Sequence, residues 1–171
     1  MAVLVGIDEA GFGPILGPLV VSSSIFSLPD ELIRADLWDI LRRSIANKRR
    51  HLAGRLLIAD SKKAYSRSQG TKHLERTMLS CLKYLGQEPT TLTELISLLS
   101  PDCLERLSDY PWYKGADNCR FTADPADIAL ASAVLTDDLA TNCVKLIKLK
   151  RFFNLPRGIQ SLFQVNVPSI E

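Results

Sequence analysis

Hydrophobic and polar positions divide the chain into short segments with different periods. Residues 2–8 form a nearly continuous apolar run, and residues 16–26 form a second run after a stretch rich in glycine and proline. Two apolar runs separated by such a turn predict a β-hairpin. Because the first run has few polar positions, we expect it to be a central strand that is covered on both faces.

Apolar residues at spacings of three and four predict two helices further along the chain. One pattern runs from Pro29 to about Asn47, and the other runs from Thr71 to Gly86, where a left-handed glycine is expected to end the helix. The short apolar stretch at residues 56–59 lies between these patterns. It predicts a strand that is followed by a functional loop.

Two further helix starts are signalled by capping residues. Thr91 and Glu94 predict a capping box for a short helix. Asp124 as the N-cap, with Pro125 as the first helical residue, predicts a long helix that continues to about Phe153.

The order of these elements predicts one α/β domain over residues 1–171. This length suits one sizeable core and is short for two complete domains. Residues 87–123 are a candidate helical insertion, and a last strand is expected over residues 162–167.

The composition is typical of a folded globular protein. Apolar residues make up 46% of the chain, which is too many for a disordered one. No basic segment precedes the first apolar run, so we predict neither a signal peptide nor a membrane anchor, and we expect a cytoplasmic location. The four cysteines lie far apart without a CxxC pair, which favours free buried thiols over a zinc site. They are Cys81, Cys103, Cys119 and Cys143.

Charge is distributed unevenly along the chain. The net charge is only +2, yet residues 42–76 contain eleven Lys or Arg against two acidic residues, whereas residues 1–41 are acidic. A basic block beside an acidic one suits a polyanion held against a cation-binding carboxylate cluster. A solvated basic face would give the same pattern, and for residues 48–51 we slightly favour that interpretation.

Two adjacent carboxylates, Asp8 and Glu9, close the first predicted strand. Burial of unpaired carboxylates is unfavourable, so such a pair is usually neutralised by a cation, by bases or by protonation. Both can reach one metal only if the strand ends or twists there, which Gly11 and Gly13 permit. The alternative is that one carboxylate is exposed and the other caps the turn. The glycine spacing fits neither a Walker loop nor a dinucleotide-binding fingerprint.

The sequence Gly-Ile-Asp-Glu-Ala-Gly-Phe-Gly-Pro at residues 6–14, followed by Gly-Pro-Leu-Val-Val at residues 17–21, resembles the opening hairpin of the ribonuclease HII family. Asp-Ser-Lys at residues 60–62 is similar to a second segment of that family. The first motif is highly specific and the second is weak alone. Both motifs lie within residues 6–62, a span of about a third of the chain.

The resemblance implies a ribonuclease H-like mixed sheet flanked by helices. It also implies cleavage of RNA in RNA–DNA hybrids or in duplexes with embedded ribonucleotides. Asp8 and Glu9 would be catalytic and would bind two Mg²⁺ or Mn²⁺ ions, which prefer oxygen ligands. The implied nucleic-acid contacts are Gly11, Phe12, Gly13, Ser61, Lys62 and Lys63.

The sequence departs from the family pattern in two ways. Phe12 stands where the family usually has arginine, which leaves the substrate preference open. The family has two further aspartates after a long helix and a strand, and this chain stops near that strand. We therefore expect an N-terminal part of the domain with an incomplete metal site. Helix capping explains Asp124 and Asp127, and a solvated helix face explains Asp137 and Asp138, so none of the four is assigned a catalytic role.

The leading hypothesis is a metal-dependent endoribonuclease whose isolated chain is feeble or inactive. The alternative is a nucleic-acid-binding module that kept the scaffold and lost the chemistry. An actin-like phosphotransferase is a third hypothesis, which Pro14 and the short chain argue against. No feature of the sequence specifies an oligomeric state, and no membrane partner is predicted.

Overall fold

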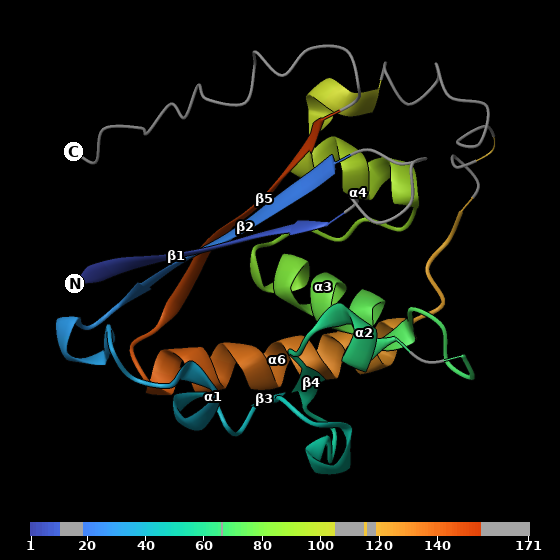
Figure 1. Ribbon diagram of the computed structural model, residues 1–171. Helices are drawn as coiled ribbons and strands as arrows, with labels where there is room; N and C mark the ends of the chain where they lie inside the picture. Colours follow the sequence, from blue (N-terminus) through green and yellow to red (C-terminus); the bar gives the residue numbers. More distant parts are fainter. Residues whose placement is uncertain (11–18, 66, 105–114, 116–118, 155–171) are drawn as a thin grey trace.

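The computed structural model describes residues 1–10, 19–65, 67–104, 115 and 119–154 (Figure 1). The strands are β1 (Ala2–Ala10), β2 (Leu19–Leu28), β3 (Ile45–Ala46), β4 (Leu56–Leu57) and β5 (Lys145–Asn154). The α-helices are α1 (Leu37–Ile40), α2 (Ser61–Ala64), α3 (Lys72–Tyr84), α4 (Leu92–Leu99) and α6 (Pro125–Thr141). Single 3-10 turns lie at Asp30–Leu32, Arg49–His51 and Pro101–Cys103. The α/β class expected from the sequence is therefore present.

The long strands form an antiparallel sheet in the order β1-β2-β5. The predicted hairpin is confirmed, since β1 pairs with β2 from Ala2 opposite Leu28 to Ala10 opposite Val20. The sequence predicts a mixed sheet, whereas the three long strands of the described residues are all antiparallel. Parallel pairing among the described residues is confined to the separate two-residue strands β3 and β4.

β1 is an edge strand of the described sheet, so the expectation of a central, doubly covered strand is wrong. β2 takes the central position because β5 pairs with its other side. Val3, Val5 and Ile7 on β1 are 49%, 49% and 70% exposed. A nearly continuous apolar run therefore does not guarantee burial on both faces.

The helix predicted to run to Phe153 ends at Thr141 instead. Cys143 follows with a φ of +55°, the left-handed conformation that favours glycine. The Val144 amide donates to the Leu139 carbonyl at 2.9 Å, which closes a helix-ending turn of the Schellman type. Residues 145–154 then extend along β2, with a register shift beside Ile25.

The helix predicted from Pro29 to about Asn47 is also broken. Asp36 accepts a hydrogen bond from the Trp38 amide at 2.8 Å and caps only the single turn of α1. Downstream, the Ser44 carbonyl accepts from the Leu56 amide at 2.8 Å. This bond belongs to the β3–β4 pairing, which takes the chain out of the helical conformation.

The helix ends predicted from capping residues are confirmed. Gly86 ends α3 with a φ of +76°, and Thr91 forms the capping box of α4 with Glu94. Asp124 caps α6 by accepting from the Ala126 amide at 3.0 Å. The strand predicted over residues 162–167 lies outside the described residues, and the candidate insertion at residues 87–123 contains α4.

The main core lies between the sheet and α6. Its buried members are Leu28, Leu41, Ile45, Leu56, Ala131, Leu135, Leu139, Val144 and Leu146. A smaller cluster of Leu82, Leu95 and Leu99 joins α3 to α4, with Leu149 of β5 packed against it. In Figure 1 the three long strands cross above α3 and α6, so helices lie against one face of the sheet.

Candidate functional site

Asp8 and Glu9 lie near the end of β1, and both are exposed. The strand continues through Ala10, so the backbone neither ends nor breaks at the pair. Neighbouring side chains of a continuous strand point to opposite faces. Asp8 therefore shares a face with Leu4, which packs on the core, and Glu9 belongs to the face of exposed Val5.

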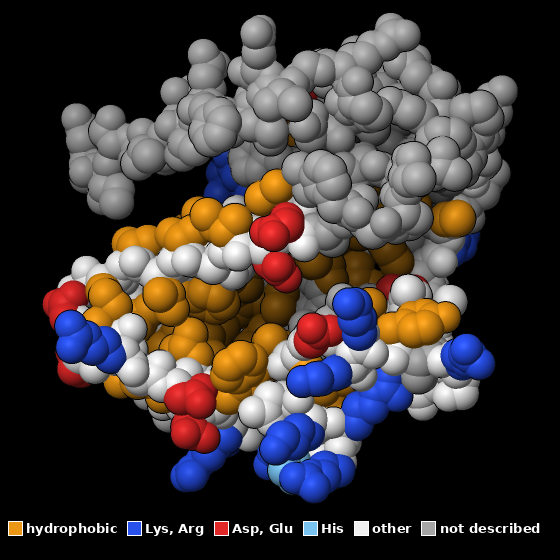
Figure 2. All heavy atoms as spheres, in the orientation of Figure 1, with side chains coloured by type: hydrophobic (Ala, Val, Ile, Leu, Met, Phe, Trp, Pro, Cys, Tyr) orange, Lys and Arg blue, Asp and Glu red, His pale blue; other side chains and the backbone are white. Residues whose placement is uncertain are grey.

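Asp8 lines a cleft of about 290 Å³ on the helix side of the sheet. Met78 of α3 and Leu99 of α4 form the apolar wall opposite the strands, and Figure 2 shows this recess below the sheet. The remaining lining residues come from the sheet: Gly6, Ile7, Ser22, Ser23, Ser24, Leu149, Lys150 and Arg151. Glu9 is not among the lining residues.

Asp8, Ser22 and Arg151 lie in one row across the three strands. The register places Asp8 opposite Ser22 and Ser22 opposite Arg151. Directly opposed side chains of antiparallel strands lie on the same face and close to one another. A carboxylate, a hydroxyl and a guanidinium group thus share the cleft. Burial lowers the pKa of Arg151, in keeping with its partly buried place there.

Sequence reasoning missed Ser22 and Arg151. The helix that the sequence predicts to about Phe153 places Arg151 near a helix C-terminus instead of on a strand. The signal that could have corrected this is the alternation of apolar and polar residues over residues 147–150, which suits a strand better than a helix.

The carboxylates do not assemble a two-cation centre from the described residues alone. Within this part of the chain no three His, Cys, Asp or Glu side chains are grouped closely enough to hold a metal ion. Asp8 can offer one oxygen ligand from the cleft, whereas the strand alternation directs Glu9 away from it. Binding of the same metals by both carboxylates therefore stays a prediction, which the alternation of β1 does not support.

The Asp-Ser-Lys segment forms the start of α2 rather than the predicted loop. Asp60 Oδ1 accepts from the Lys62 amide at 2.8 Å, which caps the short helix. Lys62 and Lys63 are exposed. Both lysines are thus accessible on a helical turn, and their contact with nucleic acid stays a prediction.

Several expected contacts fall outside what the structure describes. Gly11, Phe12 and Gly13 lie in residues 11–18, and the side chain of Ser61 is likewise outside the description. Their expected contacts with nucleic acid remain predictions.

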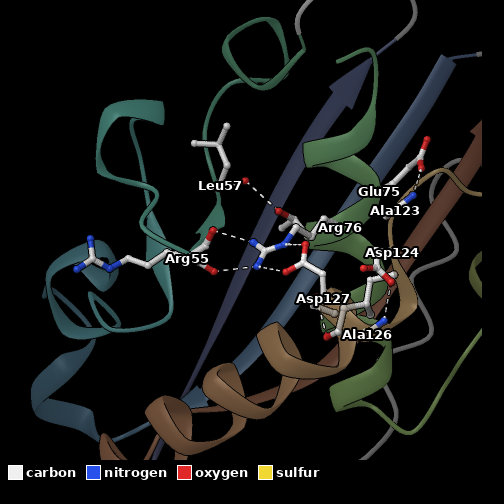
Figure 3. Close-up of polar contacts among 12 residues, drawn as sticks. Arg55, Leu57, Glu75, Arg76, Ala123, Asp124, Ala126 and Asp127 are labelled. Carbon is white, nitrogen blue, oxygen red and sulfur yellow. Dashed lines mark hydrogen bonds and ion pairs between the residues drawn. The ribbon is translucent and has the colours of Figure 1, made fainter. Parts of the chain in front are cut away.

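Acidic residues of α3 and α6 are used to hold the fold together. Arg76 donates to both carboxylate oxygens of Asp127, at 2.7 and 3.0 Å, and to the carbonyls of Gly54 and Arg55 (Figure 3). This interaction joins α3, α6 and the segment before β4. The sequence explained Asp127 by helix capping, whereas the cap of α6 is Asp124 and the Asp127 carboxylate pairs with Arg76.

Asp138 is also structural, but the prediction that it lies on a solvated helix face is wrong. It is 1% exposed. Its carboxylate accepts from the Ser44 amide at 2.9 Å and the Ser44 hydroxyl at 2.7 Å. Asp137, its neighbour, is exposed as expected and pairs with Arg43 at 2.8 Å.

The cysteines agree only partly with the expectation of free buried thiols. Cys81, Cys119 and Cys143 are free, and burial raises the pKa of the Cys81 thiol to about 12. Cys119 and Cys143 are exposed, the latter because it occupies the turn that ends α6. The side chain of Cys103 is outside the description.

No protein-family model, curated protein or solved structure matches the chain. None of the helices that the structure describes is long and apolar enough to cross a membrane.

Proposed function

We propose that this chain belongs to a metal-dependent endoribonuclease of the ribonuclease HII type that cleaves RNA in RNA–DNA hybrids. The proposal rests on the motif resemblance of residues 6–14 and 60–62. Its main structural support is the position of Asp8, which lines an open cleft. Asp8 lies in the same row across the sheet as Ser22 and Arg151.

The cleft groups suit a phosphodiester backbone. Arg151 provides positive charge, which offsets the charge of a phosphate, and the hydroxyls of Ser22 and Ser24 on the same sheet face can donate hydrogen bonds to its oxygens. A ribose hydroxyl can both donate and accept hydrogen bonds. The carboxylate of Asp8 can accept one from it, which would favour RNA over DNA at this position.

The metal-dependent step of the proposal concerns Asp8. Asp8 faces the cleft without a second described carboxylate beside it. We therefore assign Ser22 and Arg151 to binding the RNA strand, and Asp8 to offering one oxygen ligand to a divalent cation. The hydrolytic step would need further carboxylates in addition to Asp8.

The proposal is tested by incubating the chain with a duplex that contains embedded ribonucleotides, in Mg²⁺ or Mn²⁺. We expect weak, chelator-sensitive cleavage that falls by about 100-fold in Asp8→Asn, the scale at which removal of one charge-stabilising group slows an enzyme. Asp39→Asn is the matched control, because Asp39 is exposed on α1 and undergoes the same change of charge. Cleavage that survives Asp8→Asn would remove Asp8 from the mechanism.

A second function, a nucleic-acid-binding module without catalysis, is favoured by one observation. Glu9 belongs to the sheet face opposite Asp8, so the acidic pair does not converge. A binding module should hold hybrid duplex in the presence of a chelator and show no cleavage at any concentration of Mg²⁺ or Mn²⁺.

A further inference from the structure

A basic surface lies apart from the cleft, on the segment that connects β3 to β4 and on α2. Lys48, Arg50, Lys62 and Lys63 are its exposed members, and we call these four residues the basic surface. Figure 2 shows basic side chains gathered over this region of the molecule. The resemblance to a nuclease motif accounts for Lys62 and Lys63 but not for Lys48 or Arg50.

Arg49 joins the two segments into one surface. Its Nε donates to the Lys63 carbonyl at 2.9 Å, and its guanidinium Nη2 donates to the Ala64 carbonyl at 2.8 Å. These two carbonyls belong to the last residues of α2, whose C-terminal carbonyls lack helical partners. The flanking residues Lys48 and Arg50 are thereby held beside α2 rather than left on an independent loop.

The charges of the basic surface are not neutralised within the described chain. No ion pair there involves any of its four members, and the nearby acid Asp60 caps α2. The positive environment extends to His73, where burial and then the charges of Arg49, Arg76 and Lys72 lower the pKa. Clustered like charges oppose one another, so an anionic partner would relieve the repulsion.

We propose that the basic surface binds the phosphate backbone of a nucleic-acid duplex, with Lys48 and Arg50 extending the contact made by Lys62 and Lys63. This inference deepens the proposed function and rests on it for the choice of partner. It adds a binding role for the segment that connects β3 to β4. From the charge pattern alone, this segment is expected to be a solvated basic face.

Two observations favour a duplex over an anionic membrane. α2 has only four residues, too few to insert an amphipathic helical face into a lipid interface. Tyr65, directly after α2, is 51% exposed, and its side chain beside basic residues can contact the phosphates and sugars of a duplex.

The inference is tested by titrating a fluorescent RNA–DNA hybrid with the chain in EDTA at several salt concentrations. Lys48→Ala with Arg50→Ala is compared with Lys145→Ala with Lys148→Ala, a control that removes the same charge from exposed positions of β5. We expect the first variant to bind about ten-fold more weakly at physiological salt. Its log–log salt slope should be about 2 smaller, because two phosphate contacts are lost.

Each other outcome overturns the inference. An equal loss in both double variants would mean that only net charge matters. An unchanged affinity in Lys48→Ala with Arg50→Ala, or no binding by the unaltered chain, would exclude the basic surface. Tighter binding to phosphatidylserine vesicles than to the hybrid would assign the surface to a membrane. Because EDTA removes divalent cations, a failure of cleavage leaves this result intact, and the two proposals fail separately.

Discussion

The carboxylates of the helical layer and those of β1 differ in what they contact. Glu75, Asp127 and Asp138 each accept at least two hydrogen bonds from other residues, whereas Asp8 accepts only one, from the Glu9 amide, among the interactions of the described residues. The carboxylates of the helical layer are thus already engaged in hydrogen bonds that hold the fold together. An exposed carboxylate in a cleft, without such partners, is the kind of group that remains available to a ligand.

The largest loss of stability is expected from Arg76→Ala, because Arg76 joins α3, α6 and the backbone before β4. Removal of the guanidinium leaves the Asp127 carboxylate and two carbonyls without their donors. We expect the free energy of unfolding to fall by about 3 kcal/mol. Urea denaturation measures this change.

Arg43→Ala is the matched control for that change. Its ion pair with Asp137 is more than half exposed on both sides, so we expect a loss below about 1 kcal/mol. Equal losses in the two variants would show that the Arg76 interaction does not hold the layers together.

A smaller effect is expected from Asp138→Ala. This buried carboxylate satisfies the amide and the hydroxyl of Ser44, which would lose their partner. We expect a loss of about 2 kcal/mol, measured by thermal denaturation. Asp137→Ala, one residue earlier and exposed, should lose less than half as much; a reversed order would contradict the assigned burial.

Acidic pH should weaken the helical layer through Glu75. Burial disfavours its charged form, but hydrogen bonds from Thr71, Thr122 and Ala123 outweigh burial and lower its pKa below the ordinary 4.5. A carboxylate with a lowered folded-state pKa contributes stability above its unfolded pKa, and this contribution is lost as the pH falls through the folded value. Unfolding free energies measured from pH 6 downward should therefore decrease below about 4.5.

Glu75→Gln tests the origin of that decrease. Because glutamine does not titrate, the variant should show a shallower dependence on pH over the same range. The same slope in both proteins would assign the pH dependence to other carboxylates, among them Asp127, whose pKa the hydrogen bond from Arg76 lowers.

The smallest change in stability is expected from Asp8→Asn. The side chain is exposed, and its one described hydrogen bond is local, from the Glu9 amide at 3.0 Å. We expect the free energy of unfolding to stay within about 0.5 kcal/mol of the unaltered chain. A loss as large as that of Asp138→Ala would make Asp8 another structural acid and would remove the contrast between the two regions.

Features set by neighbouring residues could be predicted from the sequence. The caps at Thr91 and Asp124 and the left-handed Gly86 depend on contacts within one turn, so their residue types are informative. The end of α6 could not be predicted in this way, because Cys143 occupies a position that usually requires glycine.

Features set by distant partners could not be predicted. β5 forms by pairing with β2, which lies more than 100 residues earlier in the chain. The cleft row of Asp8, Ser22 and Arg151 depends on that pairing. The motif therefore predicts a role for Asp8, but only the register of three strands shows which residues share its face and that Glu9 does not.

The central claim, that Asp8 is available to a divalent cation in the cleft, is tested most directly by paramagnetic broadening. Mn²⁺ is titrated into ¹⁵N-labelled chain, and the loss of amide signal is mapped onto the sequence. The account predicts broadening centred on Asp8 and extending to Ser22 and Arg151, its neighbours in the sheet, which persists in Asp39→Asn and disappears in Asp8→Asn. Broadening centred elsewhere, or unchanged in Asp8→Asn, would contradict it.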